Sequence, residues 1–560
     1  MLKRSKFLRR LLRVLAVIIL LFGLLFLYLM WVSNIKPPEV TDKSALQLQV
    51  QQPDSGLYTI QNNWFRKSNS GLYEMYTEGN TPFFRGVIEG KLSEGLIKKQ
   101  EDYFTEQLFK MIPSNGYRHF LKYFIGWFNR NLPDYVLPEF EDEIYGISFA
   151  ASNDYGFIGT KYQRILNYHS AHDIGHALQN LMLVGCTSFG TWGNASEDST
   201  LIIGRNFDFY VGDDFAKNKI VSFNHPSSGY KFMSVTWGGF VGVVSGMNEK
   251  ELTVTINAAK SNIPKGAATP VSLVAREIVQ YAKNIEEAIA IAKKRKMFVS
   301  ESFLVGSAAD NKAVLIEKTP DSLAVYDPNT NEILCTNHFQ SNSFLHLKSN
   351  EEQMAENATT YRYKRLSQLV QQKGKNTVQK TVNILRDFRG IDNANIGLGN
   401  EKAVNQFIAH HSIVFEPQKL LVWVSTSPWQ MGEFVCYDLK KIFAMNGMQV
   451  NHEIYEPGLT IAPDSFIYTP QFKQFEQYRH YKQMVFDKKA IIPDSIVTAN
   501  PYLYNSYVIA ADQYYKQKNY QKALVLYQKA ATLEIASAAE RRHVEERKKD
   551  CTAHLQEGKK

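Results

Sequence analysis

The stretch from Gly185 to Phe209 reads GCTSFGTWGNASEDSTLIIGRNFDF, and the interpretation of the whole chain starts from it. A glycine precedes Cys186, and a strand-like run with Arg205 and Asp208 in its second half follows. If the peptide bond before Cys186 were cut, the new α-amine, with a pKa of about 7.7–8.0 in short peptides, could accept the thiol proton. Taken alone, Cys186 also fits a small buried apolar residue.

The secondary-structure pattern changes on the two sides of this stretch. Residues 56–185 are aromatic-rich and predicted to be largely helical, for example over 92–111. Downstream, strands are predicted at 200–208, 231–244, 252–257, 302–308, 313–318 and 333–336, with one helix at 272–295. Strands and helices mixed in this way predict an α+β sheet sandwich.

Length and composition exclude several classes of protein. A chain of 560 residues is too long for one ordinary core, and 44% hydrophobic with 21% charged residues excludes general disorder. The formal charge is +9, but the first thirteen residues supply six of these charges. The remaining charge is small and no helix-turn-helix or RNP-like motif accompanies it, so we expect no nucleic-acid partner.

An uncharged apolar run from Val14 to Val32 follows the basic amino terminus. At about 1.5 Å per residue it would span roughly 28 Å, close to the thickness of the hydrocarbon core of a bilayer. The apolar part of a cleaved signal peptide is usually about 7–15 residues, so a retained signal anchor is favoured. The basic cluster then stays in the cytoplasm, and we expect a single-pass membrane protein with its catalytic part on the extracytoplasmic side.

The carboxyl-terminal region carries a different pattern. Residues 510–533 are spaced like one helix-turn-helix unit of a tetratricopeptide repeat (TPR). Because a solenoid needs at least three repeats, we expect a single TPR-like hairpin that packs on the main domain, forms a dimer contact or binds a protein partner.

These patterns divide the chain into six predicted segments. They are 1–32 (cytoplasmic end and anchor), 33–55 (linker), 56–185 (α-rich upstream segment), 186–450 (catalytic domain), 451–500 (connection) and 501–560 (hairpin and charged helix).

Metal and redox chemistry have little support in the sequence. The run HSAHDIGH places His169, His172, Asp173 and His176 at helical spacing, which leaves open a metal hydrolase, although no HExxH motif is present. GxSxG, Walker and GxGxxG motifs are absent. The four cysteines have no C-x-x-C spacing, so we expect no zinc framework, and a disulfide among Cys335, Cys436 and Cys551 is left open. No metal or other cofactor is predicted.

Seven short motifs between Phe84 and Ser427 occur in an order that carries a family resemblance. They are Arg85-Gly86 through Gly90, Gly185 to Ser188, Gly204 to Phe209, Gly246 to Lys250 leading to Ile256-Asn257, Thr336 to Phe339, Tyr361 to Tyr363, and His411-Ser412 through Pro417. Together they resemble the amino-terminal-nucleophile (Ntn) hydrolases of the choloylglycine hydrolase, acid ceramidase and peptidase C45 group. The C45 members, which are acyl-CoA:6-aminopenicillanic acid acyltransferase-like, are the nearest in style because a long block precedes the cysteine.

The resemblance implies a four-layer αββα sandwich and a role for each matching residue. Cys186 would be the nucleophile both in cleavage of the Gly185–Cys186 bond and in turnover, while Arg205 and Asp208 would hold the new amino terminus. Asn257 and Asn337 would stabilise the amine and the oxyanion. Arg362 matches the family's late arginine, although Arg365 could take that role.

The substrate implied is a linear amide, with a lipid-like acyl amide favoured by the anchor and with hydrolysis and acyl transfer both open. The alternative from another class is an unprocessed, membrane-tethered interaction protein that uses an Ntn-like scaffold and the hairpin.

Overall fold

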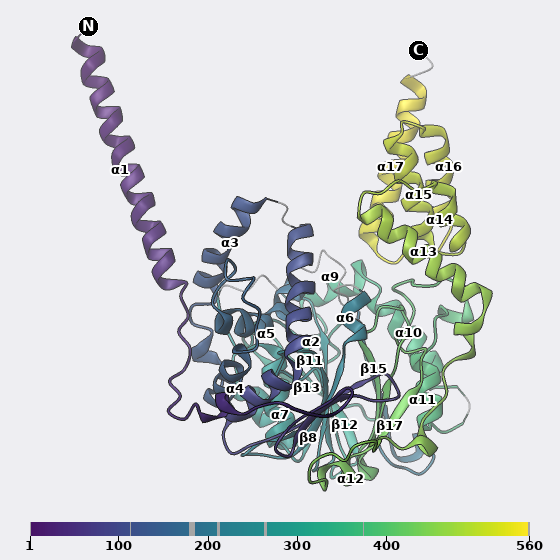
Figure 1. The fold of residues 1–560 in the computed structure, drawn as a ribbon. Helices are drawn as coiled ribbons and strands as arrows, with labels where there is room; N and C mark the ends of the chain where they lie inside the picture. Colours follow the sequence, from purple (N-terminus) through teal and green to yellow (C-terminus); the bar gives the residue numbers. More distant parts are fainter. Residues whose placement is uncertain are drawn as a thin grey trace.

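The computed structural model describes residues 2–111, 114–177, 185–209, 213–261, 266–372 and 374–557, and its strands fall into two sheets (Figure 1). The larger sheet has eleven strands in these ranges, antiparallel except for the parallel pair β4 and β7. In spatial order they are β1 Gln51–Asp54, β2 Leu57–Ile60, β3 Asn63–Lys67, β4 Tyr73–Glu78, β7 Ile220–His225, β8 Phe232–Thr236, β9 Ser245–Asn248, β10 Leu252–Ala258, β11 Glu301–Ser307, β12 Lys312–Lys318 and β13 Leu323–Tyr326.

The smaller sheet contains the segment that follows Cys186. Its described strands are, in spatial order, β14 Glu332–Cys335, β5 Thr187–Thr191, β6 Ile202–Phe207, β15 His411–Glu416, β16 Leu421–Ser425 and β17 Phe434–Asp438. Antiparallel pairing places Ser188 opposite both Arg205 on β6 and Cys335 on β14. This register brings Cys186, Arg205 and the end of β14 to one place.

The two sheets pack face to face between helices. Apolar side chains from both sheets fill the space between them, including Trp64, Val221 and Leu315 from the larger sheet and Ile203, Ile413 and Val422 from the smaller one. Helices α7 Val271–Tyr281 and α8 Ile285–Lys294 cover the outer face of the larger sheet, and α10 Thr359–Val370 and α11 Val378–Leu385 cover that of the smaller sheet. The layers are therefore helix, sheet, sheet, helix, and the mixed α and β class predicted from the sequence is confirmed.

Two predicted elements are shorter than expected. The helix predicted over 272–295 is two helices, because Ala282 is extended and the Asn284 side chain accepts a hydrogen bond from the Glu287 N–H and starts α8. The strand predicted over 231–244 ends at Thr236. A Cβ at Gly238 would lie 2.6 Å from the Leu96 carbonyl carbon, so the chain after β8 turns closely against helix α2 Pro82–Met111 rather than continuing as a strand.

The upstream segment is only partly helical. Its first part forms β2, β3 and β4 and extends the larger sheet, contrary to the helical prediction. Aromatic side chains such as Trp64 and Tyr76 favour strands, and burial on both faces hides the alternation that would have revealed them. Helices then follow at α2 Pro82–Met111, α3 Asn115–Phe128, α4 Pro138–Ser148 and α5 Lys161–Ala177.

The carboxyl-terminal region is a column of helices beside the sheets, drawn in yellow-green in Figure 1. Its members are α13 Pro470–Phe486, α14 Pro493–Ala499, α15 Tyr504–Lys516, α16 Tyr520–Ala531 and α17 Ala538–Glu557, and they share one apolar cluster. The predicted pair of helices exists as α15 and α16, while its TPR-like character stays a prediction. Helices α13 and α14 lie in the segment predicted to be only a connection.

Helix α1 Leu2–Val32 projects away from the sheets (Figure 1). Its part from Arg10 to Val32, with a mean hydropathy of 2.8, is long and apolar enough to cross a membrane, a property that a signal sequence near the amino terminus shares. The remaining described α-helices are α6 Asp213–Lys217, α9 Lys348–Glu356 and α12 Leu439–Phe443.

Candidate active site

Cys186 lies at the start of β5, inside the molecule and only 1% exposed. Its sulfur accepts a hydrogen bond from Arg205 Nη2 at 3.7 Å. The Arg205 guanidinium also donates to the carbonyl oxygen of Val244 at 2.6 Å, to the carbonyl oxygen of Ile256 and to the hydroxyl of Ser245. These contacts fix a positive charge beside the thiol.

The peptide bond predicted to be cut is held on both sides. The Gly185 N–H donates to the main-chain oxygen of Asp208 at 2.9 Å, and the Gly185 carbonyl accepts from Gln406 Nε2 at 2.8 Å. The same Gln406 nitrogen is 3.5 Å from Asp208 Oδ2. Asp208 Oδ1 is buried and has no hydrogen-bond partner among the residues that the structure describes.

Arg362 joins the cysteine to Asn337. Its Nη2 donates to the Cys186 carbonyl oxygen at 3.3 Å and to Asn337 Oδ1, and its Nη1 donates to the Glu401 carbonyl at 3.1 Å. Arg365 instead forms a two-point ion pair with Asp387, at 2.8 and 2.9 Å. Of the two arginines considered from the sequence, Arg362 is therefore the one that contacts the cysteine.

The two predicted asparagines direct their amides to main-chain carbonyls. Asn257 donates to the carbonyls of Cys335 and Thr336 at 3.4 and 3.3 Å and accepts from the Ser188 hydroxyl at 2.8 Å. Asn337 donates to the Ala258 carbonyl at 3.0 Å. Asn257 contacts Ser188, two residues after the cysteine, and Asn337 contacts Arg362, which donates to the Cys186 carbonyl. Neither amide donates to the Gly185 carbonyl.

Burial changes the acid–base behaviour of the site. Burial raises the pKa of the Cys186 thiol to about 11, although Arg205 opposes the shift. Burial also raises the pKa of Asp208 to about 7, against the lowering effect of Arg362 and then Arg205. Near neutral pH the thiol is therefore protonated and the carboxyl group of Asp208 is poised to accept a proton.

The sequence analysis does not predict a series of buried polar side chains that are linked to Arg205. The Ser245 hydroxyl that accepts from Arg205 is 2.8 Å from His411 Nε2, and His411 Nδ1 is 2.9 Å from His410 Nδ1. Lys219 Nζ donates to the His410 carbonyl at 3.1 Å. Only the His411-Ser412 motif pointed to this region, because Lys219 and Ser245 are distant in sequence and carry no local pattern.

The histidine run does not form a metal site among the described residues. His169 is buried, with Nδ1 2.8 Å from the Ile165 carbonyl and Nε2 accepting from the Val241 N–H at 3.0 Å, so neither ring nitrogen is available to a metal. His172 and His176 lie in α5, and their side chains lie outside the described residues. The four cysteines are free and buried.

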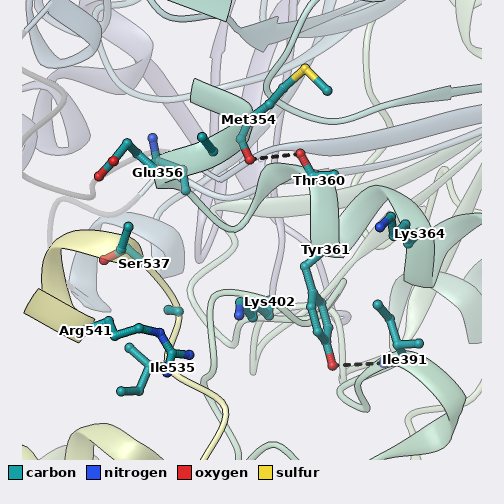
Figure 2. Close-up of a pocket in the computed structure, with 14 residues that line it drawn as sticks. Met354, Glu356, Thr360, Tyr361, Lys364, Ile391, Lys402, Ile535, Ser537 and Arg541 are labelled. Atoms are coloured by element: carbon teal, nitrogen blue, oxygen red, sulfur yellow. Dashed lines mark hydrogen bonds between the residues drawn. The ribbon is translucent and has the colours of Figure 1, made fainter. Parts of the chain in front are cut away.

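A cavity of about 290 Å³ lies next to the site, between α9, α10 and the start of α17 (Figure 2). Tyr361, which precedes Arg362, lines it and accepts a hydrogen bond from the Ile391 N–H at 3.1 Å. The cavity also contains the cations of Lys364, Lys402 and Arg541. Its lining does not include the six candidate catalytic residues, so the cavity is a neighbour of the site and not part of it.

Comparison with known proteins gives the family to which part of this chain is similar. Residues 195–427 match the family model of acyl-coenzyme A:6-aminopenicillanic acid acyl-transferase. The resemblance predicted from the sequence is confirmed. The match contains Arg205, Asp208, Asn257, Asn337 and Arg362 and begins downstream of Cys186.

Individual proteins match less of the chain. An uncharacterised protein from Archaeoglobus fulgidus is 25% identical over 273 residues, which cover 46% of this chain and 45% of that protein. The chain thus spans about half the length of the curated relatives it matches. Among solved structures, the N-acylethanolamine-hydrolyzing acid amidase ortholog of Caenorhabditis elegans has 18% identity and a TM-score of 0.30, covering 41% of this chain and 93% of its own. A variant of the conjugated bile acid hydrolase of Clostridium perfringens has 12% identity and a TM-score of 0.32, covering 48% and 99%.

Proposed function

We propose that this protein is a self-processing cysteine Ntn hydrolase or acyltransferase that acts on a linear carbon–nitrogen amide through an acyl–Cys186 intermediate. The observation that carries the proposal is the arrangement around one peptide bond. A buried thiol beside Arg205 directly follows the Gly185 carbonyl, and Asp208, with an unpaired Oδ1 among the described atoms, lies at the same bond.

Self-cleavage would begin with attack of the Cys186 sulfur on the Gly185 carbonyl carbon. The carbon–nitrogen bond breaks, the nitrogen takes up the thiol proton, and a thioester joins Gly185 to the sulfur. Water then hydrolyses the thioester to a Gly185 carboxylate and a free thiol. The new α-ammonium group of Cys186 is the partner that Asp208 Oδ1 lacks in the uncut chain.

Turnover would reuse the same groups. The α-amine of Cys186 accepts the thiol proton, the thiolate attacks the substrate carbonyl, and the α-ammonium group protonates the leaving amine. Arg362 would hold the main chain of Cys186 and the side chain of Asn337, so that the cysteine keeps its place after the upstream bond is cut. Water or a second amine completes the reaction, giving hydrolysis or acyl transfer.

The substrate we propose is a lipid-like acyl amide. The support is α1, which is long and apolar enough to anchor the enzyme at a bilayer where such substrates are concentrated. The upstream chain would keep this anchor and retain the downstream chain by packing alone, with the catalytic part outside the cytoplasm. The matched acyltransferase family supports acyl transfer as one outcome of the acyl-enzyme.

The proposal is tested by gel electrophoresis under denaturing conditions and amino-terminal sequencing of the full chain purified from membranes. We expect the wild type to separate into two chains, one beginning Cys-Thr-Ser-Phe, and Cys186→Ala to stay whole. A wild-type chain that stays whole would instead favour the unprocessed interaction protein. Loss of activity with a chelator, combined with indifference to Cys186→Ala, would favour a metal hydrolase.

A further inference from the structure

We infer that the side-chain amide of Gln406 is the oxyanion donor for cleavage of the Gly185–Cys186 bond, a role that rests on the proposed function and adds a residue to it. The Gln406 Nε2 donates to the Gly185 oxygen at 2.8 Å. This oxygen is the atom on which negative charge develops when the Cys186 sulfur adds to the carbonyl carbon. A donor already in place there stabilises the tetrahedral state with little reorganisation.

The two asparagines expected from the sequence do not have this geometry. The amide of Asn257 is directed to the carbonyls that end β14, and the amide of Asn337 is directed to the Ala258 carbonyl. Gln406 is therefore the side chain placed to stabilise the oxyanion during self-cleavage. The roles of Asn257 and Asn337 would then belong to turnover of an external substrate.

The contact between Gln406 and the Gly185 carbonyl requires a glycine at position 185. A Cβ built on Gly185 would lie 2.6 Å from the Gln406 nitrogen and 2.8 Å from its oxygen. Any larger residue at position 185 would thus push the amide away from the carbonyl that it contacts. The absence of a side chain at Gly185 therefore leaves the Gln406 amide in contact with the carbonyl.

The loop around Gln406 is fixed on both sides. Gln406 itself is 3% exposed, and the preceding Asn405 donates to the Arg386 carbonyl at 3.2 Å and accepts from the Phe407 N–H at 2.9 Å. The Phe407 carbonyl accepts from Arg479 Nη1 of α13 at 3.1 Å. A donor held this rigidly does not need to be ordered during the reaction.

The chemistry balances with Gln406 acting twice and never changing its own bonds. In the first step the sulfur–carbon bond forms, the oxygen becomes an oxyanion bound by the Gln406 N–H, and the collapse breaks the carbon–nitrogen bond while the nitrogen gains the thiol proton. In the second step water adds to the same carbonyl carbon, and the same N–H binds the second oxyanion. The sulfur then leaves as the thiolate and takes up a proton.

The experiment follows decay of the uncut full chain after pulse labelling, for the wild type and Gln406→Met, which keeps the size of the side chain but lacks an N–H. We expect Gln406→Met to slow cleavage by about 10²–10³-fold at an unchanged cleavage site. Gln430→Met is the matched control, because it removes another buried amide, which donates weakly to the Leu385 carbonyl at 3.5 Å. It should cleave within a few-fold of the wild type.

A second pair of variants separates the proposed role from a loss of folding. Gly185→Ala should slow cleavage in the wild type, where its methyl group displaces the Gln406 amide, but add little further slowing in a Gln406→Ala background, where the methyl group finds space. Folding of each variant is compared by thermal unfolding of its Cys186→Ala form, which cannot be cut. Two results would overturn the inference while leaving self-cleavage intact. One is an equal cleavage rate for Gln406→Met and the wild type, and the other is that the effects of Gly185→Ala and Gln406→Ala on the cleavage rate are additive. An uncut wild type would instead overturn the proposed function itself.

Discussion

At the scale of single residues, the acid–base state of Asp208 predicts a pH dependence for the proposed self-cleavage. Its pKa is raised to about 7, so Asp208 is protonated below this pH and is a carboxylate above it. The carboxylate, faced by Arg205, Arg362 and the Cys186 thiol, can accept a proton and bind the new ammonium group, while the protonated form cannot. We therefore expect the cleavage rate to fall as the pH decreases through about 7 and to level off above it.

The measurement is the rate of cleavage of the full chain between pH 5 and 9, with Asp208→Asn as the comparison. Asp208→Asn should be slow at every pH and lack the change near 7. If the rate instead continued to rise up to pH 9 without levelling off, ionisation of the Cys186 thiol, whose pKa is raised to about 11, would control cleavage, and the role given to Asp208 would be wrong.

The same shift predicts an effect on the stability of the uncut protein. The pKa of Asp208 is near 4 in the unfolded chain and about 7 in the folded protein, so ionising this group disfavours the folded state. The contribution of Asp208 to the free energy of unfolding therefore falls as the pH rises from about 4 to 7. In the Cys186→Ala background, Asp208→Asn should raise the Tm relative to its parent at pH 8 more than at pH 4. An equal change at both pH values would contradict the raised pKa.

The candidate site shows which residues local sequence can identify. Cys186, Arg205 and Asp208 lie within one short stretch, so their types and order were readable, and the structure brings them together. Gln406 is 221 residues from Gly185 and has no motif around it, so only the folded chain could place it there. The sequence predicts that Asn257 and Asn337 lie near the cysteine. It does not predict which atoms their amides contact, because these are main-chain carbonyls from distant parts of the chain.

At the scale of elements, helices α2 and α4 cross so closely that Gly86 has no room for a side chain. A Cβ at Gly86 would lie 2.0 Å from the Glu143 carbonyl oxygen, a main-chain atom that cannot rotate away. Gly86→Ala should therefore separate the two helices and lower the Tm by several degrees. Gly95→Ala in the same helix has nothing within 4 Å of its Cβ among the described atoms and should be neutral or stabilising by about 0.5–1 kcal/mol.

The comparison is made by thermal unfolding of both variants in the Cys186→Ala background. Similar Tm values for the two variants would mean that the α2–α4 crossing can relax.

The secondary-structure elements also show where sequence patterns stop being informative. The sequence predicts the strand at 252–257 and the helix at 92–111, which correspond to β10 and the later part of α2, because their patterns are regular. The segment that forms β2 to β4 is predicted to be helical because its strands are largely buried and show no clear period.

At the scale of the whole molecule, the carboxyl-terminal helices support the loop that carries Gln406. Asn500 donates to the Leu398 carbonyl at 2.8 Å, Asn400 donates to the Glu534 carbonyl at 2.8 Å, and Lys402 pairs with Glu534. Phe407 packs on Phe475 of α13 with ring centroids 4.8 Å apart. These helices thus lie against the same segment, 398–407, whose Glu401 carbonyl accepts from Arg362 and whose Gln406 contacts Gly185.

This packing predicts that a change in the carboxyl-terminal helices alters chemistry at Cys186. Asn500→Ala leaves the buried Leu398 carbonyl without its donor, which costs about 1–3 kcal/mol and loosens the loop. We expect self-cleavage to slow several-fold and the Tm to fall, as measured by decay of the uncut chain and by thermal unfolding. Val525→Ala, at a side chain of α16 that is 54% exposed, should change neither. Were the helices an independent module for partners, Asn500→Ala would leave the cleavage rate unchanged, because the loop would not depend on them for its geometry.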